Sequence, residues 1–77
     1  MDKILETIIK SLVDNPDEVV INETTNAKSI ICYEVKVAKD DMGKVIGKQG
    51  RTANAIRTLM KSVAGKENKK INIEFVD

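Results

Sequence analysis

Several residue types are missing or scarce in this chain of 77 residues, which has no histidine, no tryptophan and one cysteine. Without histidine, catalysis by an imidazole base and histidine-ligated metals are excluded, and a single thiol is too little for a structural zinc site. Cys32 cannot form an internal disulfide, so we expect a buried or half-buried strand residue in a reducing cytoplasm rather than a nucleophile. The composition therefore predicts neither a bound metal nor a cofactor.

Long apolar runs are absent as well. No segment approaches the length of a membrane span, and the first three residues lead directly into an amphipathic segment, not into the apolar region of a signal peptide. The apolar share of 42% and the charged share of 32% are typical of a soluble globular protein. We expect one cytoplasmic domain over residues 1–77. Its stability should be modest without self-association, because so short a chain buries only roughly 60% of its unfolded surface.

The net charge of +1 conceals a strong asymmetry along the chain. Residues 1–35 contain three Lys and seven Asp or Glu, whereas residues 36–70 contain ten Lys or Arg and three acidic residues. A near-neutral protein with one basic segment suits a polyanionic partner, and a solvated surface would have the same composition. Charge alone leaves both interpretations open.

The apolar pattern predicts the order helix, strand, strand, helix, helix, strand. Asp2 can cap a first helix that Asn15-Pro16 ends, and one face of this helix carries the apolar residues Leu5, Ile8, Ile9, Leu12 and Val13. Strands are expected at 19–25, 29–38 and 70–76. Alternation in the middle strand places four side chains on one side: Ile31, Tyr33, Val35 and Val37. Three helices would cover one face of a three-stranded sheet in a two-layer α+β domain.

The second half of the chain supplies the other two helices. Asp40 and Asp41 start a short helix through Ile46, where acidic residues favour the positive helix end. A longer helix follows from Arg51 and ends at Ala64-Gly65. Its expected inward face consists of Ala53, Ile56, Leu59, Met60 and Val63.

The tetrapeptide Gly47-Lys48-Gln49-Gly50 lies between these two helices, in the most basic part of the chain. Two glycines three apart permit a tight turn and leave no Cβ between the main chain and an approaching ligand. The helix that starts at Arg51 presents N–H groups and a positive dipole end to an anion, and Lys48 and Arg51 add side-chain charge. Glycines also serve any tight turn between helices. The coincidence with the basic segment nevertheless favours a site for a nucleic-acid phosphate backbone.

An enzymatic role is not expected. A nucleotide-binding P-loop fails at this place, because Gly43 and Gly47 enclose three residues instead of four and Gln49 replaces the magnesium-binding hydroxyl. Catalysis would also need an acid, base or nucleophile in a cleft. The available carboxylates lie at helix starts or on the surface, and Asp40 and Asp41 are interpreted as capping charges.

At residues 43–52 the chain reads GKVIGKQGRT, which resembles the signature of a KH domain. The αββααβ order resembles the type II, bacterial KH arrangement. In length and layout the whole chain is similar to the small single-domain KH proteins of the bacterial KhpA family, with the core motif at about 29–76. One departure is Ala53, because the family pattern usually has a branched aliphatic residue three positions after the second glycine.

The resemblance implies binding of single-stranded RNA, with about four nucleotides in a groove and the GxxG loop against their phosphates and sugars. The residues at the loop would be Gly47, Lys48, Gln49, Gly50 and Arg51. Beside them, Lys44 and Arg57 either extend the basic rim or remain solvated surface. An apolar floor under the bases, or else part of the core, would come from Val45 or Ile46 together with Val35 and Val37. The only aromatic residues, Tyr33 and Phe75, are too few for an RRM or a cold-shock domain, which stack bases on sheet aromatics.

A module holding four nucleotides makes few contacts, so we expect about micromolar or weaker affinity, little sequence selectivity and a salt slope of about −1.5 to −2. The resemblance implies a second module, either in a homodimer or in a heterodimer with a larger KH-containing protein of the KhpB family. It also implies RNA-chaperone-like, post-transcriptional regulation that bears on cell shape and cell wall biogenesis.

The alternative function is a protein-interaction subunit, a dimerisation module whose partner supplies most of the RNA binding. The polar side of the third helix offers no hydrophobic patch, so self-association is expected to be weak or to use another surface. That side carries Asn54, Arg57, Thr58 and Lys61.

Overall fold

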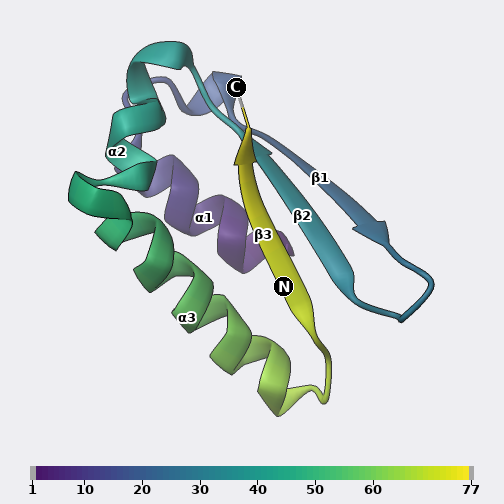
Figure 1. Cartoon of the computed structure of the whole chain (residues 1–77). Coiled ribbons are helices and arrows are strands. Elements are labelled where there is room, and N and C mark those ends of the chain that lie inside the picture. The colour runs from purple at the N-terminus through teal and green to yellow at the C-terminus, as the bar shows by residue number, and fades with distance from the viewer. Residues whose placement is uncertain (1, 77) are drawn as a thin grey trace.

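The computed structural model describes residues 2–76, in which three α-helices pack on one face of a three-stranded sheet (Figure 1). The helices and strands are α1 (Asp2–Leu12), β1 (Val20–Thr25), β2 (Ile31–Lys36), α2 (Met42–Ile46), α3 (Arg51–Lys66) and β3 (Ile71–Val76). Short 3₁₀ turns precede β1, α2 and α3, at Pro16–Glu18, Lys39–Asp41 and Lys48–Gly50. The predicted α+β class and αββααβ order are confirmed, and the arrangement is that of a type II KH fold.

The sheet is mixed, with the strand order β1-β2-β3. β1 pairs antiparallel with β2, where Ile21 lies opposite Val35, and β2 pairs parallel with β3, where Tyr33 lies opposite Ile73. A parallel pair needs a long crossover connection, which α2, the GxxG loop and α3 provide. As a result α3 runs back alongside β3, and β3 remains a free edge of the sheet (Figure 1).

The hydrophobic core lies between the helices and the inner face of the sheet. The expected alternation in β2 is confirmed, since Tyr33 and Val35 are buried while Glu34 and Lys36 are exposed. Opposite this strand the helices contribute Leu5 and Ile9 from α1, Val45 from α2, and Ile56 and Met60 from α3. Ala53, at the start of α3, is also buried. This small residue therefore allows close packing at a place where a larger side chain would need more room.

Two residues that were expected to face the core are largely exposed. Leu59 is 50% exposed and Leu12 is 38% exposed, so the prediction was wrong for both. The buried residues of α3 are Ala53, Ile56, Met60 and Ala64. Leu59 precedes Met60 and therefore points about 100° away from it around the helix, beyond this narrow buried face.

The end of α3 also differs from the prediction. The helix does not stop at Ala64-Gly65 but continues to Lys66. The positive φ that ends it, 57°, belongs to Asn68, and the N–H of Lys69 donates to the carbonyl of Ala64 (2.9 Å). Asparagine tolerates this conformation better than most residues with a side chain, so it takes over the role expected of the glycine.

Candidate nucleic-acid interface

The GxxG loop is one tight turn between α2 and α3. The N–H of Gly47 still donates to the carbonyl of Gly43 in α2 (2.9 Å), and the N–H of Gly50 donates to the carbonyl of Gly47 (3.3 Å). Gly47, Gln49 and Gly50 all have positive φ, at 75°, 58° and 75°. The chain turns within these four residues, and α3 begins at Arg51 immediately afterwards.

The two loop glycines have different surroundings. A Cβ on Gly47 would lie 2.2 Å from Oγ1 of Thr52 and 2.9 Å from the backbone nitrogen of the same residue. A Cβ on Gly50 would have no heavy atom within 4 Å. Glycine is therefore needed at position 47 for the loop to pack on α3, whereas at position 50 it leaves bare main chain open to a ligand.

Polar and charged side chains surround this open main chain. Lys48, Gln49 and Arg51 are exposed. Neither cation forms an ion pair with any residue between 2 and 76. No side chain caps the first turn of α3, a helix of 16 residues whose positive dipole end faces the loop. The structure thus brings the five predicted loop residues, 47–51, into one electropositive turn, in which the two glycines are partly buried and the other three residues are exposed.

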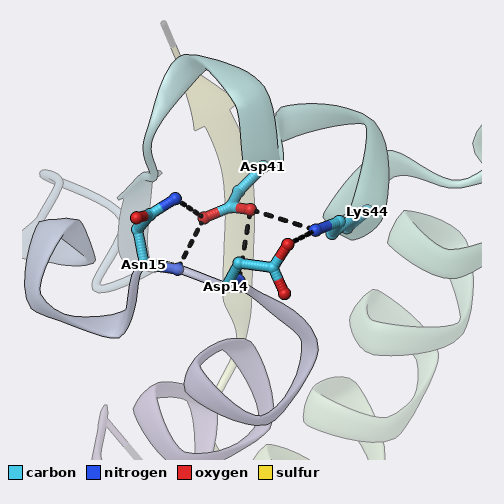
Figure 2. A network of polar contacts seen from close by, with 4 residues as sticks. All are labelled: Asp14, Asn15, Asp41 and Lys44. Carbon is cyan, nitrogen blue, oxygen red and sulfur yellow. Dashed lines mark hydrogen bonds and ion pairs between the residues drawn. The ribbon is translucent and has the colours of Figure 1, made fainter.

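Lys44 lies in the last turn of α2 before the loop, but its ammonium is already paired (Figure 2). It binds the carboxylate of Asp14 and lies 3.5 Å from Oδ1 of Asp41. The hydrogen bond to Asp14 raises the pKa of Lys44 in spite of its partial desolvation. Any contact of Lys44 with RNA would compete with this ion pair, and such a contact stays a prediction.

Asp41 was interpreted as a helix-capping charge, and it does occupy the position before the first residue of α2, but its side chain has another role. Its side chain caps no helix and is only 1% exposed. It accepts hydrogen bonds from the N–H of Asp14 (3.2 Å) and from the N–H and Nδ2 of Asn15 (2.9 and 3.0 Å), as Figure 2 shows. Burial alone would raise the pKa of Asp41, but these hydrogen bonds and Lys44 outweigh it and hold the pKa below its ordinary value. Asp41 therefore fastens the end of α1 to the start of α2.

Arg57 lies between α3 and the free edge of β3. Its Nε donates to the carbonyl of Ile73 (3.1 Å), another guanidinium nitrogen donates to Oδ1 of Asn54 (3.1 Å), and the guanidinium lies 5.4 Å from the ring centroid of Phe75. The side chain is partly buried. Arg57 is thus held in place beside β3, one to two turns along α3 from the loop.

The apolar candidates separate into core and surface residues. Val35, Val37 and Val45 are buried in the core and leave no exposed floor for a base. Ile46 is partly buried against that core, next to the loop, and is the candidate that still reaches the surface. A second surface feature is a small depression between α3 and β3, which is lined by Arg57, Lys61, Ile71, Asn72 and Ile73.

Within residues 2–76 no group of three His, Cys, Asp or Glu side chains could hold a metal ion. Nor does any helix in that range combine the length and apolarity required to cross a membrane. Cys32 is a partly buried residue of β2.

Comparison with known proteins gives a consistent picture. A family model described as "KhpA/KhpB, KH domain" matches residues 2–75. The RNA-binding protein KhpA of Clostridium acetobutylicum is 60% identical over 76 residues, which cover 99% of this chain and all of the relative. The proteins of the same name from Chlamydia trachomatis and Listeria monocytogenes are 49% and 47% identical over 77 residues, which cover all of this chain and 97% and 100% of the relatives. None of these names denotes an enzyme.

Proposed function

The chain belongs to the KhpA/KhpB family of KH-domain proteins, and from this membership and the loop geometry we propose that it binds single-stranded RNA. The observation that carries the proposal is the bare main chain at Gly50, where a Cβ would meet no heavy atom within 4 Å. Lys48 and Arg51 flank it and form no ion pair with any residue from 2 to 76. Relatives that are named RNA-binding proteins and align over nearly their whole length support it.

In the proposed complex the sugar-phosphate backbone presses against the loop. Lys48 and Arg51 neutralise phosphates, the dipole of α3 adds to their field, and the amide of Gln49 donates to a phosphate or accepts from a ribose hydroxyl. Because Gly50 has no side chain, a phosphate can approach the main chain directly. These contacts carry no information about base sequence, so the loop fixes the position of the strand and not its identity.

The bases would lie over the groove between α3 and the free edge of β3. The N–H of Ile31 donates to the carbonyl of Lys70 (3.0 Å), so the main-chain groups of Lys70 point toward β2. In a parallel ladder the direction alternates, and Ile71 and Ile73 therefore turn their main-chain groups away from the sheet. The carbonyl of Ile73 accepts a hydrogen bond from Nε of Arg57. The N–H groups of Ile71 and Ile73, which also point away from the sheet, remain able to bond to the edge of a base.

At the cellular level we propose that the protein acts in the cytoplasm as an RNA chaperone and post-transcriptional regulator that influences cell shape and cell wall biogenesis. With two or three phosphate contacts, one copy binds weakly, at about micromolar dissociation constants or above. A second KH module would raise the avidity, either from another copy of this chain or from a protein of the KhpB family. The family description, which joins the names KhpA and KhpB, supports the second arrangement.

An exposed leucine favours a second candidate function, that of a protein-interaction subunit. Leu59 is 50% exposed in the middle of α3, on a helix that was expected to offer no hydrophobic patch. A partner that covers Leu59 would leave the GxxG loop free. This candidate therefore predicts that loop variants keep the assembly intact and that Leu59 variants break it.

Reversing both loop charges tests the main proposal. The variant K48E/R51E should weaken binding of a short single-stranded RNA by more than about tenfold, as measured by fluorescence anisotropy, because two phosphate contacts become repulsions. The matched control K3E/K36E makes the same change in net charge at two exposed lysines outside the loop. It should keep most of the affinity, and both variants should melt near the wild-type temperature. Undiminished binding by K48E/R51E would show that the loop is only a turn between helices and does not contact RNA.

A further inference from the structure

The end of the molecule away from the GxxG loop carries a second concentration of lysines. The turn between α3 and β3 and the turn between β1 and β2 both lie at this end (Figure 1), and the N–H of Ile31, at the start of β2, donates to the carbonyl of Lys70, just before β3. The loop and this end are separated by the full length of α3, which is about 22 Å from Arg51 to Lys66 at 1.5 Å per residue.

Two depressions lie between and beside these turns, with volumes of about 500 and 520 Å³. They share Lys69 and Lys70, while Lys28 lines the first and Lys61 the second. Their other lining residues are apolar, carry amides or hydroxyls, or in one case, Cys32, a thiol, and no carboxylate is among them. A surface with four cations, many neutral hydrogen-bonding groups and no acidic residue suits a phosphate and excludes a cationic ligand.

These four lysines form no ion pair with the part of the chain that the structure describes. The ion pairs that the structure describes among residues 2–76 engage Lys10 and Lys44 and leave Lys28, Lys61, Lys69 and Lys70 without a partner. The nearest acidic residue in the sequence is Glu67, which is exposed and lines neither depression. Like charges on a shared surface repel one another, and a bound polyanion relieves that repulsion.

Hydrogen bonds hold both turns in a fixed shape. Oδ1 of Asn26 accepts from the N–H of Lys28 (2.8 Å) and of Ile30 (3.1 Å), and the N–H of Asn26 donates to the carbonyl of Ile30 (3.1 Å). In the other turn the N–H of Lys69 donates to the carbonyl of Ala64 (2.9 Å). The backbone that carries the lysines is therefore positioned before any ligand arrives.

The surface formed by Lys28, Lys61, Lys69 and Lys70, here called the lysine end, is continuous with the proposed RNA groove. Lys61 lines both the narrow depression beside Arg57 and the wider one beside Lys69. Arg57 and Lys61 are four residues apart and so lie on one face of α3, next to β3. Cations thus follow one another from the GxxG loop along α3 to the lysine end.

We propose that the two depressions lined by Lys28, Lys61, Lys69 and Lys70 form a second phosphate-binding site, which takes RNA that extends beyond the GxxG groove. This inference rests on the proposed function and adds to it a longer footprint. A strand that fills only the groove contacts the loop. A longer strand also enters the lysine end and gains affinity that depends on salt.

The test compares two lengths of oligouridylate, about six and about twenty nucleotides, by fluorescence anisotropy at several salt concentrations. The variant K28Q/K69Q/K70Q should bind the longer RNA about tenfold more weakly, with a salt slope smaller by roughly two, because three contacts of about 0.7 each are lost. It should bind the shorter RNA within about twofold of the wild type. A control variant, K3Q/K36Q/K39Q, removes the same charge at exposed lysines elsewhere and should bind both RNAs almost normally.

The outcomes separate this inference from the proposed function. If K48E/R51E abolishes binding of both RNAs while K28Q/K69Q/K70Q changes neither, the second site is refuted and RNA binding at the loop stands. Equal weakening of both RNAs by K28Q/K69Q/K70Q would place these lysines in the groove itself and overturn a separate site. Unchanged RNA binding with loss of association between copies in sedimentation would assign the surface to a protein partner and also overturn it. Unchanged binding by K48E/R51E would refute the proposed function instead.

Discussion

Replacing each loop glycine in turn by alanine separates their two roles, which are packing of the loop on α3 at Gly47 and access of a ligand to the main chain at Gly50. Gly50 has φ 75° and ψ 12°, a left-handed helical conformation, and a Cβ there meets no heavy atom within 4 Å. The cost of Gly50→Ala is therefore mainly backbone strain of about 1–2 kcal/mol, reduced by about 0.4–1 kcal/mol because alanine lowers the entropy of the unfolded chain. The net loss, about 1 kcal/mol, corresponds to a drop in melting temperature of about 4–8 °C.

Gly47→Ala should be much more damaging. Its φ of 75° and ψ of 176° belong to a region that is almost exclusive to glycine, with a strain of about 1–3 kcal/mol for other residues. The added Cβ also lies 2.2 Å from Oγ1 and 2.9 Å from the backbone nitrogen of Thr52. Because the backbone nitrogen cannot rotate away, α3 must shift, at a further cost of about 1–3 kcal/mol. The total of about 2–6 kcal/mol approaches the whole stability of a domain of this size, about 4–12 kcal/mol.

The assays are urea denaturation and fluorescence anisotropy with a short single-stranded RNA. We expect Gly50→Ala to fold normally and to lose about tenfold or more in affinity, because the methyl group stands where the phosphate approaches. Gly47→Ala should lose stability first. Adding Thr52→Ala to Gly47→Ala should not restore stability, since the clash between the new Cβ and the backbone nitrogen of residue 52 remains. Unchanged RNA affinity in Gly50→Ala, or equal stability of the two glycine variants, would refute this reasoning.

Three further predictions concern residues around the loop. Because the pKa of Asp41 lies below its ordinary value of 3.8, its carboxylate contributes stability that is present above about pH 4 and lost as the pH falls through the folded-state pKa. Asp41→Asn should therefore flatten the loss of unfolding free energy on acidification below about pH 4 in urea titrations, and an unchanged acid limb would contradict this. Arg57→Met should lower stability by about 1 kcal/mol through loss of the bond to Ile73 and should also weaken RNA binding, whereas normal binding in anisotropy would remove Arg57 from the interface. Leu59→Ser should change the free energy of unfolding by less than about 0.5 kcal/mol while Met60→Ala costs about 2–5 kcal/mol, and similar values for the two would show that the buried face of α3 is misplaced.

The sequence predicted the fold well because strong periodic patterns determine it. Alternation in β2 put Tyr33 and Val35 inside, and the spacing of Leu5 and Ile9 placed one face of α1 against them. The parallel pairing of β2 with β3 follows from the two helices between them. Such features depend on many residues at once, so a single deviation does not change the outcome.

The errors on α3 came from single positions at the margin of a pattern. Leu59 is apolar and lies near the expected stripe, but the buried face is only wide enough for Ala53, Ile56, Met60 and Ala64. Gly65 resembled a helix end, yet the helix continues and Asn68 provides the left-handed residue. Local propensity does not decide such cases, because the packing of α3 against the sheet determines how far the helix extends.

The sequence predicted the loop of the candidate site, but it did not predict the contacts that hold the loop and the neighbouring helices in place. Gly47 and Gly50 are equivalent in a GxxG motif, and only the position of Thr52 shows that one is packed and the other open. Asp41 is adjacent to the exposed Asp40, and the sequence pattern alone does not reveal which of the two is buried. The contact of Asp41 with Asp14 and Asn15 joins residues 26 and 27 positions apart, beyond the reach of local patterns.

The contact between the loop main chain and RNA is tested most directly by following backbone amide resonances during titration with a short single-stranded RNA. The account predicts salt-sensitive shifts that are largest at Gly47 to Arg51 and extend to Arg57 and Ile73. The exposed face of α1, around Lys3, should stay unchanged. Shifts confined to other surfaces, with the amides of residues 47–51 unmoved at saturating RNA, would contradict it.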